Sequence, residues 1–193
     1  EKTEVTRLTR DQILAIESLE LTDHLLEKTR DCFLFSYYNA GIRFSDLCRL
    51  RWNNIVDGRL VYKMSKTSAL KNIKLLPKSV EILEKYSGDK SKGELIFHLI
   101  PDGLEVLPEM KRISSANVSY NKRLKRLSKL VGIEASISSH TARHSFADYA
   151  RKSNMSLYDI SKALGHSDIS ITKEYLASFD ETSLDESMES LFN

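Results

Sequence analysis

The sequence has few of the residues that mark special classes of protein. Its 193 residues include two cysteines, three prolines and seven glycines, which argues against a disulfide-stapled scaffold and against a proline- or glycine-rich disordered chain. Apolar runs such as "CFLF" at 32–35 are far shorter than the roughly 20 residues that cross a bilayer, so we do not expect a membrane protein. The remaining composition is ordinary, and its 41% of hydrophobic residues can build one sizeable core.

The two cysteines and the first residues of the chain bear on its location. Cys32 and Cys48 lie in apolar helical patterns and do not make a disulfide framework, and no basic, apolar leader opens the chain. We therefore expect a cytoplasmic protein. Because the first residue is Glu1 and not methionine, we also expect the chain to be a piece of a longer protein.

Charge is strongly segregated along the chain. Between residues 111 and 130 there are seven basic side chains and no acidic one, namely Lys111, Arg112, Lys122, Arg123, Lys125, Arg126 and Lys129. Residues 180–193 carry five acids and no base, so without that tail the formal charge of +2 would become +7. A basic body of this kind favours a polyanion such as nucleic acid as partner. A solvated helix face explains the same charges, and charge alone does not decide between the two.

Helical periodicity dominates the pattern of apolar residues. Cap signals and periodicity predict helices over 10–19, 23–40, 46–52, 79–87, 114–130, 141–152, 156–164, 168–178 and 183–192. Two β-type runs at 59–65 and 72–76, separated by "KTSALK", predict a hairpin with a long basic tip, and a further short strand is predicted at 94–100. The expected fold class is mainly α with a small antiparallel β-sheet (α+β), in a single domain.

The segment "SSHTARHSFADYA" carries a compact group of polar residues. On a helix His140 and Arg143 are i, i+3 neighbours that project outward or into a cleft, while apolar side chains such as Phe146 face the core. His140 and His144 have the spacing of a zinc helix, but Thr141 stands where metalloproteases place a glutamate base. We therefore expect no metal and no cofactor. An ordinary surface helix also explains this pair of residues when it is taken alone.

The segment "SKALGHSDISITKEYL" at 161–176 places His166 on a turn and Tyr175 on the helix that follows. Two plain interpretations are open: Tyr175 is a core aromatic, or the segment is a non-catalytic helix-turn-helix that binds DNA. A helix-turn-helix regulator would explain the basic charge of the chain, but it gives no reason for Arg43 and Lys66. "NAGIRFSDLCRLRW" places Arg43 at a corner between helices, with Asp46 three residues on and able to fix its guanidinium, and "MSKTSALKNIKLLP" places Lys66 at the end of a strand.

These residues follow the order Arg, Lys, His-x-x-Arg, His, Tyr. The boxes "GIRFSDL", "HTARHSFA" and "LGHSDISITKEYL" together resemble the catalytic domain of the tyrosine recombinases, the phage-integrase family, and look most like integrases of prophages and conjugative transposons. The resemblance runs from about Leu8 to the C-terminus. Asp46 departs mildly from the pattern, since many family members have glutamate there.

The resemblance implies a DNA strand exchange enzyme that needs no metal. The catalytic residues that it implies are Arg43, Lys66, His140, Arg143, His166 and the nucleophile Tyr175, with Asp46 in support. The phenol would attack a DNA phosphodiester and form a 3′-phosphotyrosine. The two arginines and His166 would bind the phosphate oxygens. His140 would accept the phenolic proton, and Lys66 would protonate the leaving oxygen. Lys71 and Lys74 are alternatives to Lys66 and otherwise phosphate contacts. Further DNA contacts are expected from Lys122, Arg123, Lys125, Arg126 and Lys129.

The resemblance also implies partners and a division of the chain. Residues 1–181 would be the catalytic domain and 182–193 a helix that packs on a neighbouring protomer, with folding back onto its own domain as the alternative. An amino-terminal DNA-binding domain is expected outside this chain. The expected partners are double-stranded DNA and other protomers of a tetrameric synapse, while accessory proteins and the recombination site stay open. A DNA-relaxing topoisomerase with the same chemistry and a helix-turn-helix regulator are the competing functions.

Overall fold

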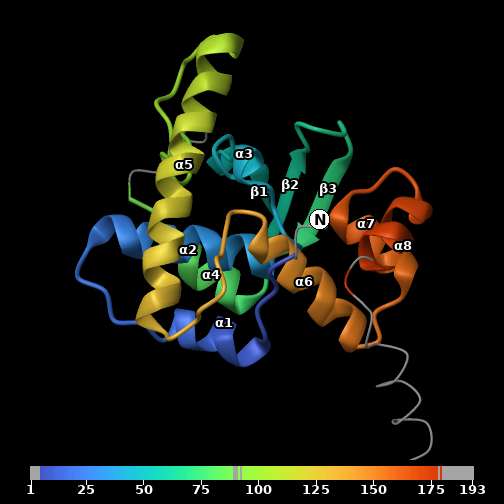
Figure 1. The fold of residues 1–193 in the computed structure, drawn as a ribbon. Coiled ribbons are helices and arrows are strands. Elements are labelled where there is room, and N and C mark those ends of the chain that lie inside the picture. The colour runs from blue at the N-terminus through green and yellow to red at the C-terminus, as the bar shows by residue number, and fades with distance from the viewer. Residues whose placement is uncertain (1–4, 89–90, 92, 178, 180–193) are drawn as a thin grey trace, which may run out of the picture.

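Helices surround α2, and a small sheet stands beside them (Figure 1). The structure is a computed structural model and describes residues 5–88, 91, 93–177 and 179. In chain order its elements are α1 (Arg10–Glu17), α2 (His24–Tyr38), α3 (Phe44–Leu47), η1 (Trp52–Asn54), β1 (Ile55–Val56), β2 (Arg59–Lys63), β3 (Leu70–Lys74), α4 (Pro77–Glu84), α5 (Val106–Leu130), α6 (Thr141–Lys152), α7 (Leu157–Leu164) and α8 (Ile169–Ala177). The expected fold class, mainly α with a small antiparallel sheet, is confirmed.

The first two helices begin where local capping chemistry places them. The Thr9 hydroxyl accepts a hydrogen bond from the backbone N–H of Gln12, and the Gln12 side chain accepts one from the N–H of Thr9. Asp23 accepts from the N–H groups of Leu25 and Leu26. Both predicted starts are confirmed, because the N–H groups of a first helical turn need acceptors from outside the helix.

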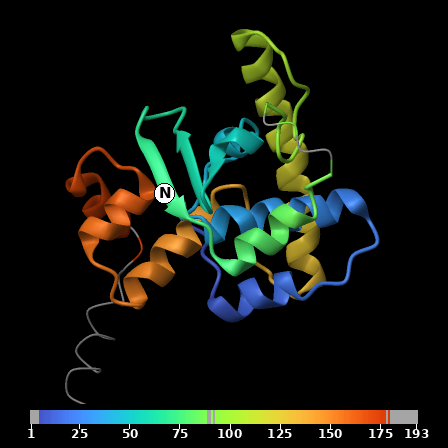
Figure 2. The ribbon, with the colours of Figure 1, turned by 180° about the vertical axis from the view of Figure 1, so that it is seen from behind.

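The main core is built around α2. This helix packs against α1, α4, α5 and α6, and Figure 2 shows α4 lying over it from behind. Phe33 and Phe35 of α2 are fully buried, and the Phe35 ring meets the edge of Phe97 at 5.2 Å between centroids. The C-terminal end of α2 is therefore held rigidly, and the residues that follow it start the candidate site.

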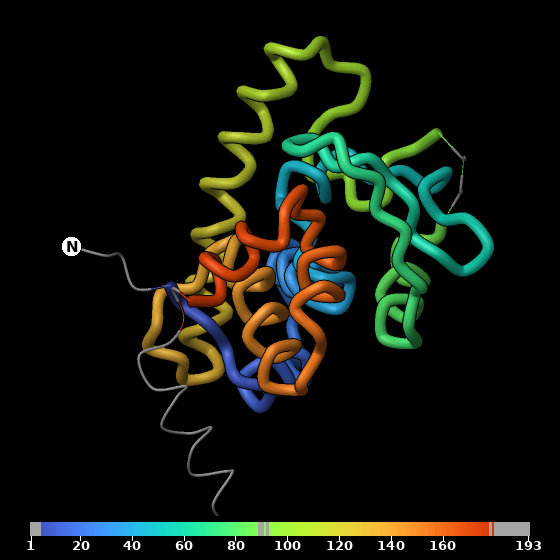
Figure 3. The backbone as a smooth tube through the Cα atoms, turned by 90° about the vertical axis from the view of Figure 1, so that its right-hand side faces the viewer, coloured from blue at the N-terminus to red at the C-terminus, as the bar shows by residue number. Residues whose placement is uncertain are grey.

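A second, smaller core joins α6, α7 and α8. It consists of Ala147, Ala150, Ile160, Leu164, Leu176 and Phe179, with Phe146 packed against both cores. Figure 3, seen from the side of α7 and α8, shows these two helices as a compact pair set against α6. The segment that bears His166 and Tyr175 thus has its own packing.

The sheet has the order β1-β2-β3, with both pairs antiparallel. The predicted hairpin is confirmed, with Tyr62 opposite Lys71. Strand β1, which pairs Val56 with Arg59, was not expected. The strand predicted at 94–100 is wrong, because only a bridge from Leu95 to Arg51 forms there among the described residues.

Two predicted helix starts also need correction. Helix α5 begins at Val106, eight residues before the predicted start, because Pro108 falls in the first turn, where the missing N–H is not needed. Ser45 lies inside α3, whose N-cap residue is Arg43. Arg43 therefore stands at the start of this short helix.

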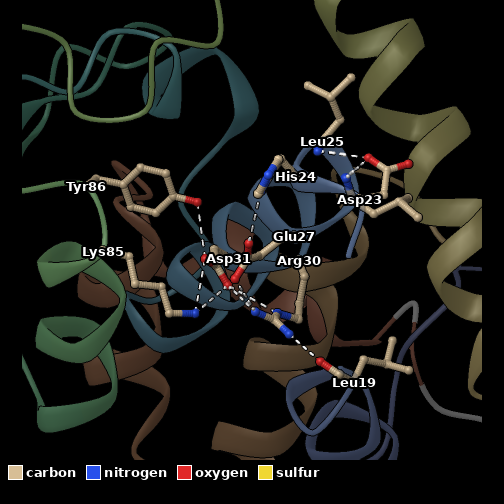
Figure 4. A network of polar contacts seen from close by, with 10 residues as sticks. Leu19, Asp23, His24, Leu25, Glu27, Arg30, Asp31, Lys85 and Tyr86 are labelled. Carbon is tan, nitrogen blue, oxygen red and sulfur yellow. Dashed lines mark hydrogen bonds and ion pairs between the residues drawn. The ribbon is translucent and has the colours of Figure 1, made fainter. Parts of the chain in front are cut away.

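A buried carboxylate ties α2 to its neighbours (Figure 4). Asp31 is 1% exposed and accepts hydrogen bonds from Arg30, Lys85 and Tyr86 at 3.1–3.2 Å. Arg30 also donates to the carbonyl of Leu19 at 2.5 Å. Two cations and a phenol thus pair with the buried charge, which makes the burial tolerable.

Among the described residues no helix is both long enough and apolar enough to cross a membrane. Cys32 and Cys48 are buried free thiols. The predicted helix at 183–192 lies outside the described residues, so its docking stays a prediction.

Candidate active site

The site starts at the corner between α2 and α3. Ala40 and Gly41 have φ values of +61° and +66°, so the chain turns sharply and delivers Arg43 to the start of α3. A Cβ atom on Gly41 would lie 2.6 Å from the Cα of Arg143 on α6. Glycine is therefore required both by the backbone conformation and by contact with α6. This contact brings the corner and Arg143, far apart in sequence, to one place.

Arg143 is buried, with 6% of its surface exposed. Its Nη1 donates to the carbonyl of Gly41 at 3.0 Å, and its Nη2 donates to the carbonyl of Leu164 at 2.7 Å. Burial, followed by the charge of Arg43, lowers the pKa of Arg143 to about 10. Of the two expected orientations, outward or into a cleft, the outward one is wrong for Arg143, because its guanidinium joins α6 to the α2 corner and to α7.

His166 follows Gly165, the left-handed C-cap of α7. Its Nε2 lies 3.2 Å from Nη2 of Arg143, and its Nδ1 lies 2.8 Å from the hydroxyl oxygen of Thr172. Since a guanidinium can only donate, Nε2 accepts from it and Nδ1–H donates to Thr172. Burial and the charges of Arg143 and Arg43 lower the pKa of His166 to about 4. In this arrangement Nε2 cannot donate to a phosphate without being protonated first.

Tyr175 lies on α8 and is half-buried. Its ring meets His166 edge-on at 5.8 Å between centroids, and its hydroxyl oxygen lies 2.5 Å from Nδ1 of His144. Burial raises the pKa of Tyr175, and the charges of Arg143 and Arg43 act against that rise. The contact with His144 was not anticipated from the sequence, where this histidine entered only as a rejected metal ligand.

A cavity of about 470 Å³ opens between the hairpin, α3, the start of α6 and α5. Arg43, Lys66 and His140 line it together. Lys66 is exposed at the hairpin tip. His140, the N-cap residue of α6, keeps part of its surface open, and desolvation with the charges of Arg143, Arg43 and Lys66 lowers its pKa. All six predicted catalytic residues thus lie around one region. Direct contacts join Arg143, His166 and Tyr175, while Arg43, Lys66 and His140 line one cavity. The charges of Arg43 and Arg143 act on both groups.

Asp46 does not fix Arg43 as expected. Its Oδ1 accepts from the backbone N–H of Ser65 at 2.9 Å and from the Ser65 hydroxyl at 2.6 Å, so the carboxylate holds the base of the hairpin tip instead. Within the described part of the chain, Arg43 Nη1 and Asp46 Oδ2 are buried without a hydrogen-bond partner. The Arg43 guanidinium therefore keeps donor capacity for a ligand.

The three hairpin lysines named as candidates differ in their environments. Lys71 is 3% exposed, and its Nζ donates to the carbonyl of Ala40 at 3.1 Å. Burial and the charges of Arg143 and Arg43 lower the pKa of Lys71 well below its ordinary value. Lys71 is thus placed beneath the corner and not as a phosphate contact, which corrects the expectation, whereas Lys66 and Lys74 are exposed.

The basic face of α5 is only partly as expected. Lys122, Lys125, Arg126 and Lys129 are exposed, and Arg126 lies 3.6 Å from the carboxylate of Asp23. Arg123 turns toward α2 and donates from Nε to the hydroxyl of Thr29 at 2.8 Å. Four of these five residues therefore remain available to a polyanion.

The arrangement as a whole suits an anion better than a metal ion. Among the described residues no group of three or more histidine, cysteine, aspartate or glutamate side chains is placed to hold a metal. Arginine and lysine side chains gather instead, next to a phenol that can act as a nucleophile.

Comparison with known proteins agrees with this chemistry. Residues 6–182 match the model of the phage integrase family. Tyrosine recombinase XerC of Xanthomonas campestris pv. campestris (strain B100) is 31% identical over 140 residues, which are 72% of this chain and 41% of that protein. The chain thus spans less than half the length of this curated relative.

Two solved structures share the fold. The site-specific recombinase XerH bound to palindromic difH substrate has a TM-score of 0.69 at 16% identity, covering 99% of this chain and 54% of the other. A lambda integrase (75–356) dimer bound to a COC′ core site has a TM-score of 0.64 at 20% identity, covering 94% of this chain and 61% of the other. Since the family model matches nearly the whole chain, the protein belongs to the phage integrase family.

Proposed function

We propose that this chain is the catalytic part of a site-specific DNA recombinase that cuts and rejoins strands through a 3′-phosphotyrosine. The observation that carries the proposal is that His166 contacts both Arg143, at 3.2 Å, and the ring of Tyr175, edge-on at 5.8 Å between centroids. The charges of Arg143 and of Arg43, which lies 100 residues earlier in the sequence, act on the same phenol. A protein that only binds DNA gains nothing from placing these groups around a half-buried phenol. The cytoplasm, where free thiols persist, is the proposed location.

Arg43 and Arg143 would stabilise the phosphoryl group in the transition state of its transfer. In the pentavalent state the extra negative charge lies on the non-bridging oxygens. A guanidinium presents two donors in a plane and keeps its proton at neutral pH, even at Arg143, whose pKa is lowered to about 10. The free Nη1 of Arg43 would be one of the groups that bind these oxygens.

Lys66 would supply the proton for the leaving 5′ oxygen. It stands at the exposed hairpin tip and lines the cavity with Arg43 and His140, whereas the alternative Lys71 is buried on the carbonyl of Ala40. The new phosphotyrosine bond retains the energy of the broken phosphodiester. A second strand's 5′-hydroxyl could therefore reverse the step without an external energy source.

Double-stranded DNA and further copies of the chain are the proposed partners. The relatives described above are a recombinase on its DNA substrate and an integrase dimer on a core site, and the exposed lysines of α5 offer phosphate contacts. A tetrameric synapse and exchange of the segment 182–193 between protomers belong to the same proposal.

The test is capture of the covalent intermediate. The chain is incubated with nicked duplexes tiled across the DNA that flanks its gene, since a nick lets the cleaved 5′ fragment diffuse away and traps the adduct. We expect a denaturant-stable adduct with wild type and none with Tyr175→Phe, which keeps the ring but has no nucleophilic oxygen. Arg143→Ala should slow adduct formation by a factor on the order of 10²–10³. An adduct formed by Tyr175→Phe would show that another residue is the nucleophile.

The same assay separates the competing functions. A helix-turn-helix regulator would bind a duplex and form no adduct with any of them. A topoisomerase would form the adduct and relax a supercoiled plasmid that carries no specific site, whereas a recombinase requires paired sites for rejoining to new partners.

A further inference from the structure

His144 contacts the hydroxyl group of the proposed nucleophile directly. It follows Arg143 on α6, and its Nδ1 lies 2.5 Å from the hydroxyl oxygen of Tyr175 on α8. The two rings are inclined by 31° with centroids 5.5 Å apart, and Phe179 meets both rings edge-on at 5.9 and 4.8 Å. The phenol and the imidazole are thus held against each other by packing from a third ring.

The direction of this hydrogen bond follows from the charges around it. Burial, followed by the charges of His140, Arg143 and Arg7, lowers the pKa of His144 to about 4, while burial raises the pKa of Tyr175. At neutral pH the imidazole is therefore uncharged and the phenol keeps its proton. The phenol O–H donates to Nδ1, and the imidazole proton resides on Nε2.

The other two histidines of the candidate site, His166 and His140, are placed for different tasks. His166 uses Nδ1 on Thr172 and Nε2 on Arg143, so neither nitrogen is open to the phenol. His140 lines the cavity with Arg43 and Lys66, and its ring centroid lies 6.2 Å from that of His144. The geometry therefore separates a histidine on the phosphate side, His140, from one on the phenol side, His144.

We propose that His144 is a catalytic residue, the acceptor of the Tyr175 proton during strand cleavage. This inference rests on the proposed function. In the step, the phenol O–H bond breaks and its proton passes to Nδ1 of His144, the phenol oxygen forms a bond to phosphorus, and the bond from phosphorus to the 5′ oxygen breaks as Lys66 supplies a proton to that oxygen. On rejoining, a 5′-hydroxyl gives its proton to the neutral amine of Lys66 and its oxygen bonds to phosphorus. The bond from phosphorus to the tyrosine oxygen breaks, and the imidazolium returns its proton to that oxygen.

Two substitutions separate proton acceptance from positioning. In His144→Asn the side-chain oxygen can occupy the place of Nδ1 and accept the same hydrogen bond, but the amide cannot take up a proton. His144→Ala removes both abilities and leaves a hole that free imidazole can fill. We expect both variants to form adduct 10²-fold to 10⁴-fold more slowly than wild type on the same nicked duplex. Imidazole in the buffer should restore the rate of adduct formation by His144→Ala, whereas His144→Asn should stay slow.

The pH dependence of the rate and a modified substrate measure properties that would not change if His144 had only a structural role. The rate of His144→Asn should rise about tenfold per pH unit toward alkaline pH, as hydroxide replaces the missing base, while wild type stays flatter. A duplex with sulfur in place of the bridging 5′ oxygen has a leaving group that needs no proton. It should therefore rescue Lys66→Ala but not His144→Asn.

Each outcome assigns or removes the role. If wild type forms an adduct and His144→Asn, folded by circular dichroism and bound to the duplex, forms it equally fast, the inference is wrong while the proposed function stands. A slow His144→Asn that the sulfur substrate rescues would also overturn it, because the defect would then lie in protonating the leaving group. If wild type forms no adduct on any duplex, the proposed function fails and this inference fails with it.

Discussion

Replacing Gly41 with alanine should disturb both the backbone and the guanidinium of Arg143. The φ of +66° at Gly41 would cost an alanine about 1–2 kcal/mol. The new Cβ would lie 2.6 Å from Cα of Arg143 and 2.7 Å from its Cβ and Cγ, and such overpacking costs about 1–3 kcal/mol. We expect Gly41→Ala to lower the free energy of unfolding by about 2–5 kcal/mol in all.

The control for this substitution is Gly58→Ala. Gly58 has a nearly identical φ of +69°, but nothing lies within 4 Å of its added Cβ. It should therefore show the backbone penalty alone, about 1–2 kcal/mol. Urea denaturation with an unchanged m-value measures both. Equal shifts in the two variants would refute the claim that the corner and α6 are in forced contact.

The clash also bears on the proposed chemistry. Two of the three atoms nearest to the added methyl group are Cα and Cβ of Arg143, so a change of rotamer cannot relieve the contact and α6 must move. Gly41→Ala should then form adduct more slowly than Gly58→Ala on the same duplex. Equal adduct rates would mean that the site tolerates displacement of this helix.

Two further predictions concern lysines. Lys71→Met should stabilise the chain by about 1 kcal/mol or more, because it removes a buried cation, yet slow adduct formation by releasing the carbonyl of Ala40. Folding lowers the pKa of Lys71 below its ordinary value of 10.5, so the unfolded chain binds more protons than the folded chain in the pH range between the two values. The free energy of unfolding of wild type should therefore rise as the pH increases toward 10.5. The variant should lack that rise. A variant less stable than wild type at pH 7 in thermal melts would contradict this. Replacing Lys122, Lys125 and Lys129 with glutamine should reduce the slope of log binding constant against log salt by about 0.9 for each phosphate that these lysines neutralise in wild type; an unchanged slope would place DNA elsewhere.

Local chemistry made part of the fold predictable. Helix starts at Thr9 and Asp23 depend on side chains that bond to N–H groups within three residues, so sequence spacing is sufficient. Strand β1 could have been found from Asp57 and Gly58, both at positive φ, because this dipeptide favours the tight turn of a hairpin. The early start of α5 was not predicted, because proline is common both in loops and in the first turn of a helix, so Pro108 alone does not distinguish the two.

The candidate site could be predicted only for residues that lie within a sequence motif. The three boxes contain five of the six predicted catalytic residues, and the hairpin segment contains Lys66. The contact of His144 with Tyr175 joins positions 31 apart on different helices, and nothing local predicts it. Lys71 offered a weak signal, since alternation along β3 places it on the same face as Ile73, away from the exposed Leu70. The charge of Lys71 favours a surface position, whereas its place in the alternation indicates a buried one.

The buried cations at the corner after α2 link the stability of the chain to its proposed reaction. Lys71 and Arg143 bond to the carbonyls of Ala40 and Gly41, and a carbonyl satisfies a donor without cancelling a charge. Burying these charges is unfavourable, and their lowered pKa values express that cost. An incoming phosphate offsets it, and the pentavalent state, with more negative charge, offsets it further, so the site favours the transition state over the bound diester. Substitutions that remove charge here should therefore make the chain more stable and strand cleavage slower.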